Sequence, residues 1–178
     1  YLIQKGLILE KLGQIDEALA IYKKASEQDP YRADVWTNQA NIFRQKKEYP
    51  AAEDYYKRAL AQDFDDIASR HNLAELLCRM GRVAEALEQY RAVLIRNPDY
   101  IPSLYNLAII LENRGEYAEA LGLYFKVLLG DNTPKDIEWR IADSLSKLAS
   151  IDNILSTNLF SNNKYQDIFN MDYNDLFI

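Results

Sequence analysis

Three stretches of the chain share a pattern in which an Asn in the third place is followed two places later by an Ala. They are WTNQANIF at 36–43, RHNLAELL at 70–77 and LYNLAIIL at 104–111. The Asn residues stand at 38, 72 and 106, so the step is 34 residues both times. Small residues such as Ala let two helices pack closely, whereas Asn is a mediocre helix former. The pattern therefore predicts a helical repeat that keeps a polar side chain at one fixed place.

The same period runs through most of the chain and predicts pairs of antiparallel helices. A small residue of the first helix recurs as Gly6, Ala40, Ala74, Ala108 and Ala142. The second helix repeats a small residue and, four places later, a Tyr, as Ala18 and Tyr22, Ala52 and Tyr56, Ala86 and Tyr90, and Ala120 and Tyr124. Left-handed helix ends are expected at Gly13, Gly81 and Gly115, with Lys47 at the equivalent place. Because only a neighbouring pair can cover the apolar face of each pair, we expect an all-α stacked solenoid.

This order of small and aromatic residues resembles the tetratricopeptide repeat (TPR) family, which implies a right-handed α-solenoid, the TPR superhelix. The expected TPR array has four full units and the first helix of a fifth, over residues 1–149. Residues 150–178 differ in composition, because they contain six Asn and no Ala, Glu or Arg. Their apolar residues still follow a helical spacing. We expect atypical C-terminal helices that cap the array, dock a partner or mediate self-association.

Composition and charge argue against several classes of protein. The chain has 178 residues, of which 48% are hydrophobic, so disorder is not expected. Its net charge of −6 and the lack of a basic stripe argue against nucleic acid as a partner. No apolar run approaches the roughly 18 residues of a membrane span. One Cys suits a reducing, cytoplasmic compartment. The chain begins with Tyr1, and we interpret it as a piece of a longer or processed protein.

The sequence contains no group of residues that favours catalysis or metal binding. His71 is the only His, and no second His or Cys lies near it in the sequence to complete a metal site. No His is placed to activate Cys78 as a nucleophile. The pair Asp65–Asp66 falls in a turn between repeats, and no phosphate-binding Gly loop is present. We therefore expect a non-enzymatic protein without a metal or another cofactor.

The direction of the Asn side chains suggests a binding surface. At about 100° per residue, each Asn lies about 200° from the small residue and points away from its partner helix. In TPR arrays this side lines the concave groove, so the resemblance implies peptide binding by Asn38, Asn41, Asn72, Tyr105, Asn106 and Arg140. An Asn amide can pair with both the N–H and the C=O of an extended peptide. The alternative, in which Asn bridges adjacent helices or is solvated, remains open.

The resemblance also suggests which kind of partner the groove takes. The Asn series is similar to the peptide-gripping array in the TPR arm of O-linked N-acetylglucosamine transferases and in peroxisomal import receptors. The family's carboxylate clamp fits poorly, because its basic residues would fall at Thr37, Pro102 and Asn106. The leading hypothesis is a scaffold that binds an extended protein segment. The alternatives are a substrate-recruiting arm of a larger enzyme such as a glycosyltransferase, a secretion or assembly chaperone, and an oligomerisation module.

Overall fold

The computed structural model describes residues 1–131 and 133–158, with side chains up to residue 151. All regular secondary structure in this part of the chain is helical. The elements are α1 (Leu2–Lys11), α2 (Ile15–Gln28), α3 (Ala33–Gln45), α4 (Tyr49–Gln62), α5 (Ile67–Arg79), α6 (Val83–Arg96), α7 (Ile101–Asn113), α8 (Tyr117–Leu129) and α9 (Ile137–Asn158). They form two compact units, Tyr1–Tyr100 and Ile101–Ile178. The prediction of an all-α fold made of helix pairs is confirmed.

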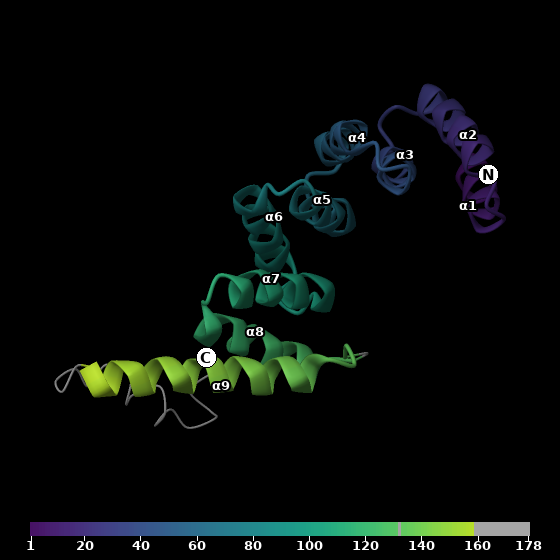
Figure 1. The fold of residues 1–178 in the computed structure, drawn as a ribbon. Helices are drawn as coiled ribbons and strands as arrows, with labels where there is room; N and C mark the ends of the chain where they lie inside the picture. The colour runs from purple at the N-terminus through teal and green to yellow at the C-terminus, as the bar shows by residue number, and fades with distance from the viewer. Residues whose placement is uncertain (132, 159–178) are drawn as a thin grey trace. The chain divides into compact units, whose positions relative to one another are not determined.

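Unit 1 consists of three antiparallel helix pairs, α1 with α2, α3 with α4, and α5 with α6 (Figure 1). The second helix of one pair also packs on the first helix of the next, so α2 contacts α3 and α4 contacts α5. Tyr22, Tyr56 and Tyr90 are almost completely buried, and each contacts the first helix of its own pair, at Glu10, Asn41 and His71 respectively. A Cβ atom on Gly6 would lie 2.3 Å from the Tyr22 ring, so α1 needs Gly where the later units have Ala. The predicted series of small and aromatic residues is therefore the core of the repeat.

The first helix of each of the four pairs ends in a left-handed residue, as the sequence predicts. The φ angles are 76° at Gly13, 77° at Gly81, 79° at Gly115 and 62° at Lys47. The Lys47 N–H donates to the carbonyl of Arg44 over 3.0 Å, and the Glu48 N–H donates to the carbonyl of Phe43 over 2.9 Å. These bonds satisfy carbonyls that the end of α3 would otherwise leave free. Lys47 therefore adopts a conformation that is unfavourable for a residue with a Cβ atom.

Replacing Lys47 with Gly is expected to raise the free energy of unfolding by about 1 kcal/mol, because Gly reaches positive φ without steric cost. The reverse change, Gly81→Lys, should lower it by a similar amount. A Cβ at Gly81 would meet no atom within 4 Å, so that variant reports the backbone conformation alone. Urea denaturation followed by circular dichroism measures both. A destabilised Lys47→Gly variant would mean that the Lys47 side chain contributes more than its backbone strain costs.

Unit 2 contains the pair α7 and α8, with α9 packed on α8. Helix α9 runs without a break through position 149, where the sequence analysis ends the repeat array (Figure 1). Ile137, Ile141 and Ser144 are buried, whereas Ala142 and Leu145 are exposed. In the four helix pairs the small residue equivalent to Ala142 is buried. In a fifth pair Ala142 would face a second helix, and that helix would consist of residues after 151, whose side chains lie outside the described part.

Helix α9 begins at Ile137, three residues after Pro134. The Ile137 N–H donates to the Pro134 carbonyl over 3.2 Å. The apolar residues predicted to form the last C-terminal helix, between 165 and 177, lie outside the described residues. The division at 149/150 and the capping, docking or self-association role of residues 150–178 remain predictions.

Candidate peptide-binding groove

The first helices of the pairs in unit 1 share one polar face. Between α3 and α5, the hydroxyl of Thr37 hydrogen-bonds to that of Ser69, and Arg44 Nη1 pairs with Glu75 Oε2 at 3.2 Å. An open hollow of about 520 Å³ joins this face to α1, because Glu10 lines it together with Arg44 of α3 and Arg79 of α5. In unit 1, the helices that carry the Asn positions therefore border a common depression.

Two of the predicted binding residues, Asn41 and Asn72, are brought together on this face. Asn72 Nδ2 donates to Asn41 Oδ1 over 3.3 Å, and the same oxygen accepts the hydroxyl of Tyr56 over 2.6 Å. Burial raises the pKa of Tyr56 to about 12, so its hydroxyl remains a neutral donor at neutral pH. Asn72 thus bridges adjacent first helices. The N–H donors of Asn41 form no hydrogen bond with the side chains or backbone described here.

The Asn residues at 38, 72 and 106 share a repeat position but have different surroundings. Asn38 is half-buried on α3 and forms no side-chain hydrogen bond within the described residues. Asn106 is half-buried on α7 of unit 2 and already has an interaction partner in the protein. Asn38 therefore has a free amide, whereas Asn72 and Asn106 also interact within the chain.

The remaining predicted residues, Tyr105 of α7 and Arg140 of α9, meet in unit 2. The Tyr105 hydroxyl donates to Asp136 over 2.7 Å and accepts Arg140 Nε over 3.2 Å. Arg140 Nε also pairs with Asp136 Oδ2 at 2.7 Å, and its guanidinium lies 5.7 Å from the centre of the Tyr105 ring. The hydrogen bonds from Tyr105 and Arg140 lower the pKa of Asp136. These contacts hold Tyr105 and Arg140 in place on α7 and α9.

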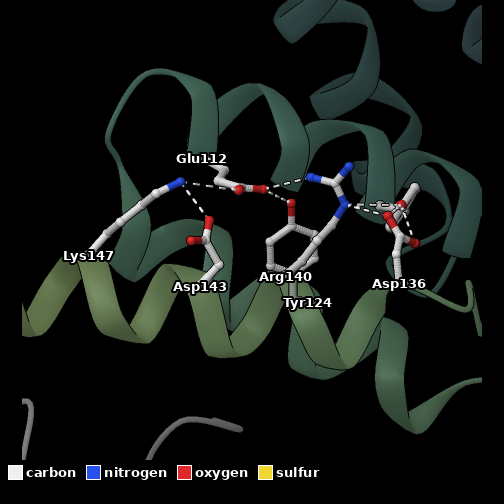
Figure 2. Close-up of polar contacts among 7 residues, drawn as sticks. Glu112, Tyr124, Asp136, Arg140, Asp143 and Lys147 are labelled. Atoms are coloured by element: carbon white, nitrogen blue, oxygen red, sulfur yellow. Dashed lines mark hydrogen bonds and ion pairs between the residues drawn. The ribbon is translucent and has the colours of Figure 1, made fainter.

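Arg140 also pairs with a buried acid that the sequence analysis did not single out. Glu112 of α7, whose side chain is 6% exposed, accepts Arg140 Nη1 over 2.9 Å and the hydroxyl of Tyr124 (Figure 2). Lys147 Nζ lies 3.9 Å from the other carboxylate oxygen of Glu112 (Figure 2). Because Arg140 has three internal partners, its first role is to join α9 to α7. The sequence signal for this pair is its spacing. Glu112 precedes Arg140 by 28 residues, in a chain whose repeat period is 34.

The side chains of the described part are better suited to binding a partner than to catalysis. His71 packs between Tyr90 and Tyr100, with ring centres 5.6 and 5.4 Å away, and burial lowers its pKa. Burial also raises the pKa of Cys78, which keeps it a protonated thiol. Among the described residues, no group of three His, Cys, Asp or Glu side chains could hold a metal ion. No helix in this part is long and apolar enough to cross a membrane.

Helix pairs that expose a polar face of their first helices define a repeat protein of the helical-hairpin class. A family model described as "Tetratricopeptide repeat" matches residues 3–66 and 71–137. The chain belongs to the tetratricopeptide repeat family. This fold mediates protein–protein interactions and is generally a scaffold for them.

Known proteins with similar sequence or structure agree with this assignment. RNA polymerase II-associated protein 3 from Xenopus tropicalis is 37% identical over 78 residues, which are 44% of this chain and 11% of that protein. The pilF protein of Pseudomonas aeruginosa superposes with a TM-score of 0.74 at 23% identity, covering 90% of this chain and 76% of that chain. The first TPR of Spaghetti (RPAP3), bound to the HSP90 peptide SRMEEVD, gives a TM-score of 0.61 at 26% identity, covering 64% and 92%. The chain thus spans only a small part of its curated relative.

Proposed function

We propose that this chain is a non-catalytic scaffold that binds an extended segment of a partner protein along α1, α3 and α5 of unit 1. The observation that carries the proposal is the shared polar face of these helices. There, Asn38 has a half-buried amide and Asn41 has N–H donors that lack partners among the described residues. Such amides can hydrogen-bond to the backbone of many different sequences.

The spacing of the helices suits an extended ligand. Packed helices lie roughly 8–10 Å apart and an extended chain rises roughly 3.3 Å per residue, so successive first helices would contact about every third residue. The structurally similar TPR of Spaghetti (RPAP3) was solved with a bound peptide, which supports peptide binding as the mode of interaction. In unit 2, Tyr105, Asn106 and Arg140 would form a binding surface of their own, with Arg140 positioned by Glu112.

The test is a titration of peptides selected from a displayed library of random segments of about twelve residues, long enough to cross three helices. The double variant Asn38→Ala/Asn72→Ala is expected to bind on the order of 10- to 100-fold more weakly, since each lost neutral hydrogen bond costs about 0.5–1.5 kcal/mol. Ala is the better helix former, so the helices should persist. Isothermal calorimetry gives the affinities, and circular dichroism checks the fold.

Two controls separate binding from folding. Gln62→Ala removes an exposed amide from α4, a second helix, and should leave the affinity unchanged. Asn38→Ala alone removes no hydrogen bond within the described part of the chain, so it should weaken binding without changing the melting temperature. If folded Asn38→Ala and the folded double variant bind as tightly as the wild type, Asn38 and Asn72 have no role in binding. Failure to select any binding peptide would contradict the proposed function itself.

A further inference from the structure

The hollow between α1, α3 and α5 carries more positive charge than the chain around it. Its lining residues are three cations, Arg44, Lys47 and Arg79, and one acid, Glu10, together with the polar groups of Asn41, Gln45 and Tyr49. The chain as a whole has a net charge of −6, so this concentration of cations is opposite in sign to the protein. We call these seven residues the basic hollow.

Most of the N–H donors in the basic hollow lack a partner in the described protein. Glu75 pairs with Arg44 Nη1 at 3.2 Å and with Arg79 Nη2 at 2.9 Å, so two guanidinium groups share one carboxylate. Each guanidinium has five N–H donors, and Arg44 Nε is buried without a hydrogen bond. Lys47 is exposed and forms no ion pair with any described residue.

Several acceptors around the basic hollow are already in use. Glu10 accepts the hydroxyl of Tyr22, and Asn41 Oδ1 accepts both Tyr56 and Asn72. Glu75 is ionised, because the hydrogen bond from Arg79 and the charges of both Arg residues outweigh its burial and lower its pKa. A ligand that entered the basic hollow would therefore meet N–H donors with positive charge that outnumber the free acceptors of Glu10 and Gln45. A carboxylate has the matching chemistry, since it only accepts hydrogen bonds and pairs well with guanidinium groups.

We propose that the basic hollow binds a carboxylate of the partner segment, either an Asp or Glu side chain or the C-terminal carboxylate. This inference rests on the proposed function and adds one specific element to it. The Asn amides recognise the backbone of any extended segment, whereas the basic hollow selects segments that carry an acid near the contact with α3 and α5. The site differs from the three basic positions of the family's carboxylate clamp, which Thr37, Pro102 and Asn106 occupy here.

The experiment compares three matched pools of random peptides on the full chain. The first pool carries Glu and Asp with an amidated C-terminus, the second carries Gln and Asn in their place with the same amide, and the third carries Gln and Asn with a free C-terminal carboxylate. The wild type is expected to bind the first or the third pool about 10- to 100-fold more tightly than the second, the range for hydrogen bonds to a charged group. The preference should decrease at higher salt, because the hollow is open to solvent.

Variants assign the preference to the basic hollow. Arg44→Gln/Arg79→Gln should abolish the preference for a carboxylate, whereas Arg58→Gln/Arg96→Gln, which removes two exposed and paired Arg side chains elsewhere, should retain it. Lys47→Gln disturbs no contact of the described protein, so it should reduce the preference several-fold without affecting folding. Its matched control is Lys126→Gln, an exposed charge on α8.

The outcomes separate this inference from the proposed function. Equal binding of all three pools would overturn the carboxylate site and leave peptide binding in place. A preference that survives in the folded Arg44→Gln/Arg79→Gln and Lys47→Gln variants would also overturn it, because the carboxylate would then bind elsewhere. Binding of no pool at all would contradict the proposed function, and the inference with it. If the third pool alone is preferred, the carboxylate is that of a chain end; if the first pool alone is preferred, it is a side chain.

Discussion

Replacing Tyr90 with Ala is expected to lower the free energy of unfolding by about 3–5 kcal/mol, the usual cost of deleting a large buried aromatic side chain. Tyr90 is 1% exposed and packs against His71 with a ring separation of 5.6 Å. Removal of the ring would leave a cavity between α5 and α6 that rigid helices cannot close. For a chain of this length the melting temperature should fall by roughly 10 °C. Thermal and urea denaturation followed by circular dichroism measure the change.

A matched control for this prediction is Tyr31→Ala, because Tyr31 is 82% exposed. Its effect should stay within about 0.5 kcal/mol, as for most surface substitutions. Stability in a repeat array depends mainly on neighbouring repeats, so amide hydrogen exchange should show the largest loss of protection around α5 and α6. An unchanged melting temperature for Tyr90→Ala would mean that the buried Tyr series does not hold the helix pairs together.

The second large effect is expected for Arg140→Met, which should destabilise unit 2 by about 3 kcal/mol. Glu112 would keep its place in the protein with its side chain 6% exposed, but it would lose the guanidinium that now lies 2.9 Å from its carboxylate. Lys147 at 3.9 Å would compensate the buried Glu112 charge only in part, and removing the main partner of a buried pair costs more than the pair itself contributes. Hydrogen exchange of the amides in α7, α8 and α9 localises the effect, and urea denaturation gives its size.

The double variant Glu112→Gln/Arg140→Met tests the reason for this effect. It removes both charges, so most of the lost stability should return. Arg96→Met is the control for a surface pair, because Arg96 and Asp65 are both at least half exposed and such pairs contribute at most about 1 kcal/mol. A fully stable Arg140→Met variant with weakened peptide binding would show that Arg140 serves the ligand and not the attachment of α9.

The sequence predicts the features that recur at a fixed period and depend on local geometry. The Tyr series is buried because each ring packs on the first helix of its own pair, as Tyr22 does beside Gly6 and Tyr90 beside His71, and the same spacing marks it in four repeats. The left-handed helix ends are predictable because Gly favours that conformation at low cost, and even Lys47 was placed by its position in the repeat. The direction of Asn38 follows from helical periodicity in the same way.

Side-chain pairs that join α3 to α5, and α7 to the residue just before α9, were not predicted, although they follow a rule. Asn41 with Asn72, Arg44 with Glu75 and Tyr105 with Asp136 are each separated by 31 residues. This spacing is three residues shorter than the repeat period of 34, so the second residue of each pair lies nearer the start of its own repeat than the first. Which of these pairs form depends on rotamers and on burial, which periodicity does not determine. For that reason the sequence predicts Arg140 as a ligand contact but does not predict its pairing with Glu112.

The exposure of one side of α9 is not determined by periodicity alone. Ala142 and Leu145 are exposed, although Ala142 stands at the repeat position whose small residue is buried in the complete pairs. Periodicity identifies the positions, but their burial depends on whether a neighbouring element covers them. The sequence-predicted C-terminal cap over this face is therefore still a prediction about residues after 151.

Binding of an extended segment along the first helices is tested most directly by a nuclear magnetic resonance titration of the isotope-labelled chain with a selected peptide. We expect the side-chain amide signals of Asn38, Asn41 and Asn72 to shift on binding, together with backbone amides of α3 and α5. A carboxylate-bearing peptide should also shift the Nε–H signals of Arg44 and Arg79. Shifts confined to the second helices α2, α4 and α6, with the three Asn signals unchanged, would contradict binding along the first helices.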